Sequence, residues 1–286
     1  MEKNKVLGGV LYLVGTPIGN LADISERAVK VLTEVDFIAA EDTRNSARLL
    51  SALGIQHKEL VSYHEHNKRA SGERLCARLL SGESCALITD AGMPAISDPG
   101  EDVVRLCAQS GIPVSVVPGA CAAVCALALS GLSTRRFAFE GFLSANKGER
   151  RKMLDSLKGE ARTMIFYEAP HKLKATLDDM LSAFGGERRI SLCRELTKLN
   201  EEVERTTLSD AVEAYSVREP RGEYVLIVEG GEGEMSNDGS GELCALSPEE
   251  HVEHYISAGL GRMDAIKAAA KDRKMTKSEL YKLLNQ

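Results

Sequence analysis

Two patterns of apolar residues alternate along the first 120 residues of the chain. Five short, continuous apolar runs, typical of strands covered on both faces, lie at residues 10–14, 37–40, 60–63, 85–88 and 114–117. Between these runs, apolar residues recur at helical spacing, as at positions 21, 24, 28, 31 and 32. Strands that alternate with helices in this way predict an α/β domain with a parallel, doubly wound sheet.

The second part of the chain has more strands than helices. Residues 120–129 are a run of small apolar residues that predicts a helix, and residues 173–184 have the spacing of another. Strands are expected at residues 137–143, 163–167, 189–193, 203–207 and 224–228. Because strands outnumber helices here, we expect a second α/β domain with a mixed sheet.

These patterns divide the chain into four segments. They are an N-terminal α/β domain at 1–119, a C-terminal α/β domain at 120–230, a flexible linker at 231–246 and a helical tail at 247–286. The linker is predicted from its composition, which is Gly, Ser and acidic residues with almost nothing apolar. In the tail, a helix beginning at Pro248 is followed, after a break at 259–261, by helices at 264–271 and 276–284, which suggests helix-turn-helix geometry.

The tail has a local positive charge, although the whole chain has a formal net charge of −6. From Arg262 onward it holds seven Lys or Arg residues against three Asp or Glu residues, a balance that suits contact with phosphates. Lys271, Lys274 and Lys277 are its candidate RNA contacts. The alternative is a three-helix cap that only steadies a partner or a dimer, and the sequence leaves both open.

Polar residues, glycines and prolines follow every strand predicted in the first domain. They lie at residues 15–20, 41–45, 64–68, 90–92 and 118–120. In a parallel sheet these segments all emerge at the carboxyl edge, where such folds bind ligands, so we expect the functional site there. The longest connection ends in Asp98-Pro99, which predicts an N-cap followed by Pro at the first helical position.

Composition excludes several classes of protein. The 286 residues are 43% hydrophobic and 27% charged, which is typical of a globular protein. No window approaches the roughly 18 apolar residues that a membrane span needs, and the chain does not begin with a signal pattern, so we expect a cytoplasmic protein. The seven cysteines have no zinc spacing, so we expect free thiols and no metal. Dinucleotide, Walker and nucleophile-elbow motifs are missing from the sequence.

Acidic and basic side chains gather at the predicted carboxyl edge. The candidate catalytic residues are Glu41, Asp42, Arg44 and His64, because a carboxylate beside an arginine can orient a hydroxyl group or take its proton. The alternative is that Asp42 and Arg44 only cap a helix and pair with each other.

A second cluster combines aromatic and basic residues between positions 135 and 152. Its phenylalanines lie at 137, 139 and 142, and the first two are expected in the core. Its cations can grip phosphates at the ends of a strand and a helix, and the candidate RNA contacts among them are Arg135, Arg136, Lys147, Arg150 and Arg151.

Six segments, in this order along the chain, together resemble the tetrapyrrole-methylase superfamily. They are LVGTPIGNL at 13–21, AEDTR at 40–44, SYHEHN at 62–67, TDAGMPAISDPG at 89–100, VPGA at 117–120 and YEAPH at 167–171. Within the superfamily they resemble the bacterial small-subunit ribosomal RNA 2′-O-methyltransferases, and the resemblance covers nearly the whole chain. Members that modify tetrapyrroles carry G-x-G-x-G-D and G-G-D-P loops where this chain has GTPIGN and TDAGMP, which favours the RNA-modifying branch.

The resemblance implies a two-domain methylase that holds S-adenosylmethionine in the cleft between its domains. The expected cofactor contacts are Pro17, Asp90, Ala91, Gly92, Ile96, Ser97, Asp98, Gly119 and Ala120 in the first domain and Phe166, Glu168, Ala169 and Gly222 in the second. The implied reaction is 2′-O-methylation of a cytidine in the decoding centre of 16S ribosomal RNA, with free RNA or the assembled small subunit as substrate. A homodimer is also implied.

A ribose hydroxyl is a poor nucleophile, so a base or a strong acceptor should assist it. Our hypothesis is that Glu41, Asp42 or His64 does so and that Arg44 positions a phosphate or a ribose. Two other functions compete. A small-molecule methylase shares the fold and the cofactor but has no need of the basic surfaces. A non-catalytic RNA-binding ribosome-maturation factor has no need of the crowded strand ends, so cofactor binding distinguishes it.

Overall fold

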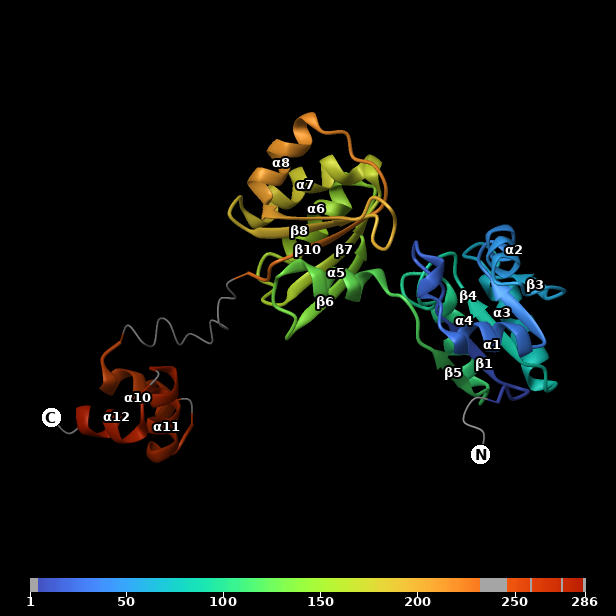
Figure 1. Cartoon of the computed structure of the whole chain (residues 1–286). Helices are drawn as coiled ribbons and strands as arrows, with labels where there is room; N and C mark the ends of the chain where they lie inside the picture. The colour runs from blue at the N-terminus through green and yellow to red at the C-terminus, as the bar shows by residue number, and fades with distance from the viewer. Residues whose placement is uncertain (1–4, 232–245, 258, 274, 285–286) are drawn as a thin grey trace. The chain divides into compact units, whose positions relative to one another are not determined.

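The computed structural model describes residues 5–231, 246–257, 259–273 and 275–284 (Figure 1). The chain forms two compact units, Met1–Gly231 and Glu232–Gln286. The first unit contains two separate five-stranded sheets, and the second contains a small group of helices. Of the predicted linker at 231–246, all but the two end residues lie outside the described residues.

The first sheet is parallel throughout, with the strand order β3-β2-β4-β1-β5 (Figure 1). Its strands are β1 (Leu11–Val14), β2 (Phe37–Ala40), β3 (Glu59–Ser62), β4 (Cys85–Ile88) and β5 (Val114–Val117). Each strand differs from its predicted run by at most one residue at either end. The predicted parallel, doubly wound sheet is therefore confirmed.

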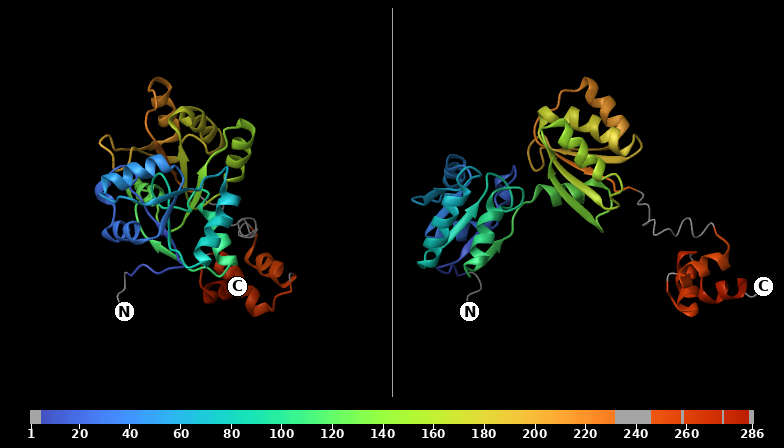
Figure 2. Two further views of the ribbon diagram at one scale, coloured as in Figure 1. Left: turned by 90° about the vertical axis from the view of Figure 1, so that its right-hand side faces the viewer. Right: turned by 180° about the vertical axis from the view of Figure 1, so that it is seen from behind.

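Helices cover both faces of this sheet (Figure 2). On one face lie α1 (Glu26–Glu34) and α2 (Thr43–Ala52), and on the other lie α3 (Lys68–Leu80) and α4 (Gly100–Gln109). The predicted helix that starts at residue 21 is interrupted after a short 3₁₀ turn, η1 (Leu21–Asp23). Helix α1 then begins where Ser25 Oγ accepts the Ala28 N–H at 3.1 Å.

The second sheet is mixed, with the strand order β6-β7-β10-β8-β9. Its strands are β6 (Phe137–Phe142), β7 (Thr163–Glu168), β8 (Arg189–Arg194), β9 (Glu202–Thr207) and β10 (Tyr224–Val228). The β6–β7 pair is parallel, and the other three neighbouring pairs are antiparallel. The predicted mixed sheet is therefore confirmed, and β6 is one of its two edge strands.

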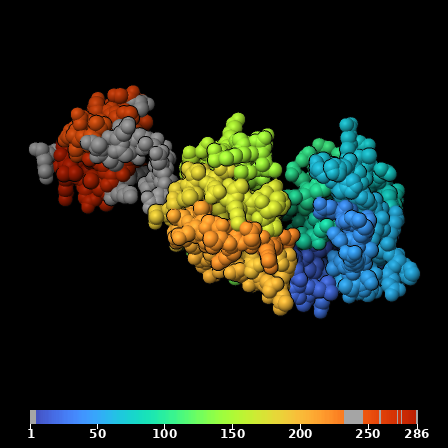
Figure 3. Space-filling model, turned by 90° about the horizontal axis from the view of Figure 1, so that it is seen from above, coloured from blue at the N-terminus to red at the C-terminus, as the bar shows by residue number. Residues whose placement is uncertain are grey.

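Helix α5 (Ala122–Ser130) packs on one face of the second sheet. The other face is covered by α6 (Lys147–Ser156), α7 (Pro170–Phe184) and α8 (Leu208–Val217), which form a continuous surface from yellow-green to orange in Figure 3. The spacing of apolar residues in the sequence predicts α5 and α7 but neither α6 nor α8. Helix α6 buries only Arg150 and Leu154, so its sequence carries almost no apolar periodicity.

The second unit contains helices α10 (Pro248–Ser257), α11 (Arg262–Asp272) and α12 (Lys277–Leu283). They share a small apolar core that includes Val252, Ile266 and Leu280. At the start of α12, the Thr276 side chain accepts the Glu279 N–H, and the Glu279 carboxylate accepts the Thr276 N–H at 2.7 Å. This reciprocal capping explains why the helix begins there.

His251 is fully buried in this unit and contacts two charged side chains. Its Nε2 lies 3.2 Å from Asp272 Oδ2, and the Arg273 Nε–H donates to its Nδ1 at 3.0 Å. Because Nδ1 accepts a hydrogen bond, the imidazole is neutral and carries its proton on Nε2. Burial lowers the pKa of His251, since it disfavours the charged imidazolium.

We expect the second unit to lose stability as the pH falls below about 6.5. A histidine of the unfolded chain titrates near that value, whereas His251 stays neutral to lower pH in the folded unit, so the unfolded state binds more protons in between. The stabilisation is complete above about pH 6.5 and is lost as the pH falls toward the lower folded pKa, by at most about 1.4 kcal/mol per pH unit.

Hydrogen exchange of the α10 amides in the full chain, corrected for intrinsic rates, measures this loss at about pH 7.5 and about pH 5.5. His251→Leu removes the difference between the two pH values. His254→Gln, at an exposed position of the same helix, keeps it. Equal protection of the unaltered chain at both pH values would contradict the expectation.

Candidate functional site

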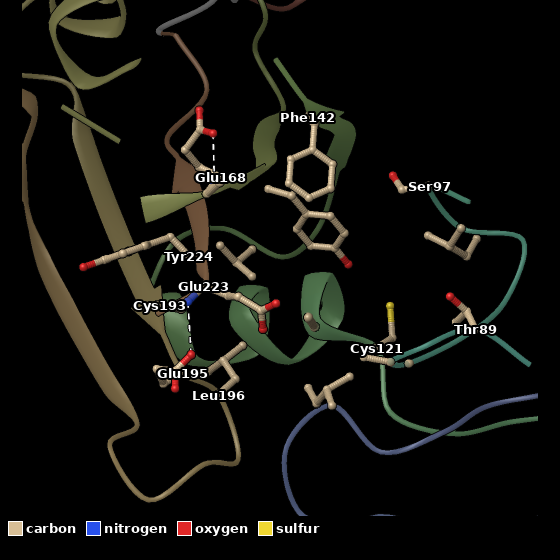
Figure 4. A pocket seen from close by; sticks show the side chains of 18 of the residues that line it. Thr89, Ser97, Cys121, Phe142, Glu168, Cys193, Glu195, Leu196, Glu223 and Tyr224 are labelled. Carbon is tan, nitrogen blue, oxygen red and sulfur yellow. Dashed lines mark hydrogen bonds between the residues drawn. The ribbon is translucent and has the colours of Figure 1, made fainter. Parts of the chain in front are cut away.

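A cavity of about 650 Å³ lies at the carboxyl edge of the first sheet and is also lined by the second sheet (Figure 4). Residues that follow β1, β2 and β4 contribute to it from the first sheet. Residues at the ends of β6, β7, β8 and β10 contribute from the second. The cavity has the volume of a small-molecule binding site, and it lies at the edge where the sequence analysis expects one.

The cavity brings together eight of the predicted site residues. They are Glu41 among the candidate catalytic residues, and Ala91, Gly92, Ile96, Ser97, Asp98, Glu168 and Ala169 among the candidate cofactor contacts. Nine others are not among its lining residues: Asp42, Arg44, His64, Pro17, Asp90, Gly119, Ala120, Phe166 and Gly222. Several of these nine directly precede a residue that lines the cavity, as Pro17 precedes Ile18 and Ala120 precedes Cys121.

Two close backbone approaches hold the loop after β1 in place. A Cβ on Gly15 would lie 2.7 Å from the Gly119 Cα, and a Cβ on Gly119 would lie 2.8 Å from the Gly15 Cα. Only glycine fits at these positions. Thr16 and Gly92 form an isolated antiparallel bridge, with N···O distances of 2.9 and 3.2 Å. Gly119 therefore acts by fixing the neighbouring loop.

The loop between β4 and α4 carries backbone strain on the cavity side. Ala95 and Ser97 have left-handed conformations, with φ of 67° and 62°. The Asp98 carboxylate holds this conformation, because its Oδ1 accepts the Ala95 N–H at 3.0 Å and its Oδ2 accepts the Ile96 N–H at 3.2 Å. Asp98 thus lines the cavity with its oxygens already engaged by the loop.

The start of α4 differs from its prediction by one residue. Gly100 is the first helical residue and Pro99 occupies the cap position, so the expectation of Pro99 inside the helix is wrong. The Asp98 Oδ1 nevertheless accepts the Gly100 N–H at 2.7 Å. Asp98 is therefore the side chain that accepts a hydrogen bond from the start of the helix, as predicted, but it lies one residue before the cap position.

Strand β7 contributes a further part of the lining, and its alternation decides which side chains lie there. The side chain of Phe166 is fully buried between the sheet and its outer helices, which leaves its main chain for the predicted cofactor contact, and that contact stays a prediction. The next residue, Tyr167, lines the cavity, and its hydroxyl accepts the Ala123 N–H at 3.2 Å. Burial raises the pKa of Tyr167 to about 12, so the phenol is neutral.

The turn between β8 and β9 lines the cavity although the sequence analysis did not predict it. Glu195, Leu196 and Lys198 contribute side chains. Lys198 Nζ lies 2.8 Å from Glu195 Oε1 and 2.9 Å from Glu223 Oε2. A Cβ on Gly222 would lie 2.5 Å from the Glu195 side chain, so this glycine makes room for the carboxylate. The sequence of the turn carries no motif that predicts a ligand site. The turn lies at the cavity because β8, which precedes it, pairs with β10.

Carboxylates outnumber cations in the cavity lining. Glu168 is buried, and its two oxygens accept the Thr176 hydroxyl at 2.5 Å and the Ala169 N–H at 2.9 Å. Among the described residues, five acidic side chains line the cavity against the single lysine Lys198; they are Glu41, Asp98, Glu168, Glu195 and Glu223. This excess of negative charge, in a site partly withdrawn from water, favours a cationic ligand.

The three candidate bases lie in different environments. Glu41 lines the cavity, where its Oε2 accepts the Thr89 hydroxyl at 2.8 Å. Asp42 caps α2 and binds Arg44, whose backbone N–H and guanidinium donate to its oxygens at 2.7–3.1 Å. These hydrogen bonds hold the pKa of Asp42 well below its usual range, which makes it a weak base. His64 Nδ1 is buried, without a hydrogen-bond partner among the described residues.

The candidate RNA contacts at Arg135, Arg136 and Lys147 are exposed. Within the described part of the chain they form no ion pair. In the tail, Lys277 is exposed at the start of α12. Lys274 and the side chain of Lys271 lie outside the described residues, so the prediction for them stays a prediction.

Arg150 is a correction to the predicted RNA surface. It is only 6% exposed, and its guanidinium lies 2.7 Å from Asp179 Oδ2. It also donates to the Ser144 carbonyl at 3.3 Å. Arg150 therefore stabilises the second sheet's helical layer and does not present its charge to a phosphate. Arg151 pairs with the other Asp179 oxygen at 2.7 Å while about half of its side chain is exposed.

Two kinds of structure are absent from the described ranges. No group of three or more His, Cys, Asp or Glu side chains there is placed to hold a metal ion. Helices in those ranges are too short or too polar to cross a membrane.

Comparison with known proteins gives consistent matches. Residues 10–212 match the family model of the Tetrapyrrole (Corrin/Porphyrin) Methylases. Ribosomal RNA small subunit methyltransferase I of Halalkalibacterium halodurans is 50% identical over 278 residues, which cover 97% of this chain and 95% of that protein. The protein of the same name from Bacillus subtilis is 47% identical, with 96% and 93% covered. The crystal structure of a diphthine synthase matches 77% of this chain and 90% of its own at a TM-score of 0.58 and 14% identity, which supports the fold alone.

Proposed function

Since this chain belongs to the tetrapyrrole methylase family, we propose that it is an S-adenosylmethionine-dependent methyltransferase of small-subunit ribosomal RNA. We further propose that the accepting atom is the 2′-oxygen of a cytidine ribose in the decoding centre, as the resemblance of the six segments implies. The observation that carries the proposal is the 50% identity, over 97% of the chain, to a protein named for ribosomal RNA methylation.

Three properties of the cavity fit S-adenosylmethionine. Its volume of about 650 Å³ suits a ligand of that size. Its acidic lining suits the positive charge of a sulfonium. Its loops are held together by the close approach of Gly15 to Gly119, and Gly92, which has no side chain, lines it. The residues that would hold the cofactor are Ile18, Gly92, Ile96, Ser97, Tyr167, Ala169 and Glu223. When bound, the cofactor supplies a methyl group on a sulfonium sulfur.

The protein's own task is to hold a ribose hydroxyl in line with that methyl group and to receive its proton. Glu41 is the candidate base that lines the cavity, and the Thr89 hydroxyl orients its carboxylate. We therefore assign proton acceptance to Glu41. Arg44 has an 83% exposed side chain at the start of α2 and is the candidate contact for a phosphate or a ribose.

Exposed cations flank the edge strand β6 and support an RNA surface. Arg135 and Arg136 precede the strand, and Lys147 opens the helix that follows it. The double substitution of Arg135 and Arg136 by Ala is expected to weaken binding of small subunits. It should also lower the salt dependence: the slope of log K against log [salt] becomes shallower by about 0.7–0.9 for each phosphate that the variant no longer binds.

Filter binding over a series of salt concentrations measures this change. The matched control is the double substitution of Lys30 and Arg105 by Ala, which removes two charges from the outer surfaces of α1 and α4. The same slope in the Arg135/Arg136 variant and in the unaltered protein would argue against this surface.

The proposed function is tested by transfer of labelled methyl groups from S-adenosylmethionine to small ribosomal subunits that lack the modification. Label on the ribose of one cytidine in the decoding centre supports the whole proposal, and label elsewhere in the RNA supports only the coarser part of it. Tight cofactor binding without transfer to subunits or RNA points to a small-molecule methylase. Absence of cofactor binding points to a non-catalytic RNA-binding factor.

The remaining expectations follow from the same proposal. A ribosomal substrate places the protein in the cytoplasm. The resemblance implies a homodimer, which sedimentation equilibrium of the full chain tests.

A further inference from the structure

We propose that Phe142 is a stacking platform for the base of the nucleotide that accepts the methyl group. This inference rests on the proposed function. It means that the accepting nucleotide is unstacked from its neighbours when its ribose enters the cavity. Phe142 lines the cavity at the end of β6 (Figure 4).

A β-bulge gives Phe142 its direction. In a regular strand, residues 139 and 142 would point to opposite faces of the sheet. Here Phe139 is paired with Ile165, but Gly141 is paired with the next residue of β7, so one residue of β6 is extra. The bulge therefore places Phe139 and Phe142 on the same face, where both rings meet Tyr167 edge to face at centroid distances of 5.1 and 5.4 Å.

Two features of Gly141 favour glycine at this bulge. Gly141 has a φ of +66°, which side chains other than glycine rarely adopt. A Cβ there would lie only 3.2 Å from Ser97 Oγ, so the strand passes close to the strained loop after β4. The bulge and the left-handed glycine change the direction of one aromatic side chain at the cavity. Bulges next to active sites commonly have this effect.

Phe142 remains open to a ligand after these contacts are made. Its side chain is 57% exposed, whereas Phe139 is packed against the inner face of the sheet and its helix α5. Figure 4 shows Phe142 and Ser97 on opposite sides of the open space. Contact with Tyr167 occupies one region of the ring and orients it, which leaves aromatic surface for a flat partner.

The chemistry of the proposed substrate matches such a surface. RNA-binding proteins recognise unpaired nucleotides by splaying bases out and stacking them on aromatic side chains. Enzymes that modify a base extrude the nucleotide into a pocket and stack the base against aromatic or apolar side chains. The cations Arg135, Arg136 and Lys147 flank β6, so phosphates bound there would lead the strand of RNA past Phe142.

The test compares Phe142→Ala, Phe142→Leu and Phe142→Tyr in single-turnover methylation of small ribosomal subunits at subsaturating concentration. Loss of stacking is expected to lower the apparent second-order rate constant about tenfold or more in the Ala and Leu variants. The Tyr variant, which keeps a flat ring, should retain the rate within about threefold. Leu80→Ala is the control, because it removes a comparably exposed apolar side chain that does not line the cavity.

Two aromatic groups could stack on Phe142: the base of the accepting nucleotide and the adenine of the cofactor. Titration calorimetry of the same variants with S-adenosylmethionine distinguishes them. Unchanged cofactor affinity together with slower transfer supports stacking of the accepting base. Cofactor affinity that falls by the same factor as the rate would overturn the inference in favour of the cofactor's adenine. Equal rates in the Ala variant and the unaltered protein would overturn it outright. Absence of any transfer by the unaltered protein overturns the proposed function, and the inference with it.

Discussion

Glu41→Gln is expected to slow methyl transfer about 10²- to 10⁴-fold, the range typical of a lost general base. Glu41 lines the cavity and its Oε2 accepts the Thr89 hydroxyl at 2.8 Å. The glutamine side chain has the same shape, and its oxygen can accept the same hydrogen bond, so the loop should remain in place. What the substitution removes is the ability to accept the ribose proton. Single-turnover transfer with saturating cofactor and subunits measures the rate, and calorimetry measures the cofactor affinity separately.

Asp42→Asn is the matched control for this prediction. Asparagine is as good an N-cap as aspartate, so α2 should keep its start. Hydrogen bonds from Arg44 already hold the pKa of Asp42 low, so little basicity is lost, and we expect less than about a tenfold change in rate. If Glu41→Gln reacts at the full rate, Glu41 is not the base. A larger loss in Asp42→Asn than in Glu41→Gln would transfer the role to the Asp42–Arg44 pair.

Arg150→Met is expected to destabilise the second sheet and its helices by about 3–5 kcal/mol, as measured for buried ion pairs that lose one partner. Asp179 is 3% exposed, and Arg150 donates to its Oδ2 through two nitrogens, at 2.7 and 2.9 Å. Burial raises the pKa of Asp179, but hydrogen bonds from Arg151 and Arg150 outweigh burial and hold it below its usual value. Methionine fills much of the space but leaves the carboxylate and the Ser144 carbonyl without these donors.

Native-state hydrogen exchange of the β7 and β10 amides measures this loss within the full chain. Arg151→Met is the matched control: its side chain is about half exposed, so its bond to Asp179 should contribute no more than about 1 kcal/mol. The double variant Arg150→Met/Asp179→Leu should recover much of the stability, since it removes the buried charge as well. Equal losses from Arg150→Met and Arg151→Met would contradict the assignment of Arg150 as the buried partner.

The sequence predicts most of the strands because their signal is local. Strands β2, β4 and β10 have the predicted bounds, since each is a continuous apolar run covered on both faces. Strand β5 also has them, although it lies at the edge of its sheet and Val114 and Val116 are exposed. The polar and glycine-rich segments after the parallel strands share an edge, because the carboxyl ends of parallel strands lie on the same side of a sheet. The segments after β1, β2 and β4 line the cavity. Of the two missed helices, α6 has the weaker pattern, because it buries only two of its ten residues.

Side-chain roles within the site were harder to predict, because they depend on partners far away in the sequence. The local sequence suggests a surface cation at Arg150, beside Arg151, and only Asp179, 29 residues further on, makes it a buried one. Phe166 and Tyr167 are adjacent and both aromatic, and the face that α7 covers decides which of them reaches the cavity. Glu195 and Lys198 line the cavity because β8 pairs with β10.

By itself, the sequence determined the two sheets of this protein, their parallel and mixed character, the edge that carries the site and the family resemblance. Each of these follows from local periodicity, from turn residues or from short motifs. The tertiary structure alone decided which of the candidate bases lines the cavity, which cations are exposed, and that a bulge turns Phe142 toward the cavity. The physical reason is that burial, ion pairing and strand register are properties of contacts between distant segments, which local sequence does not encode.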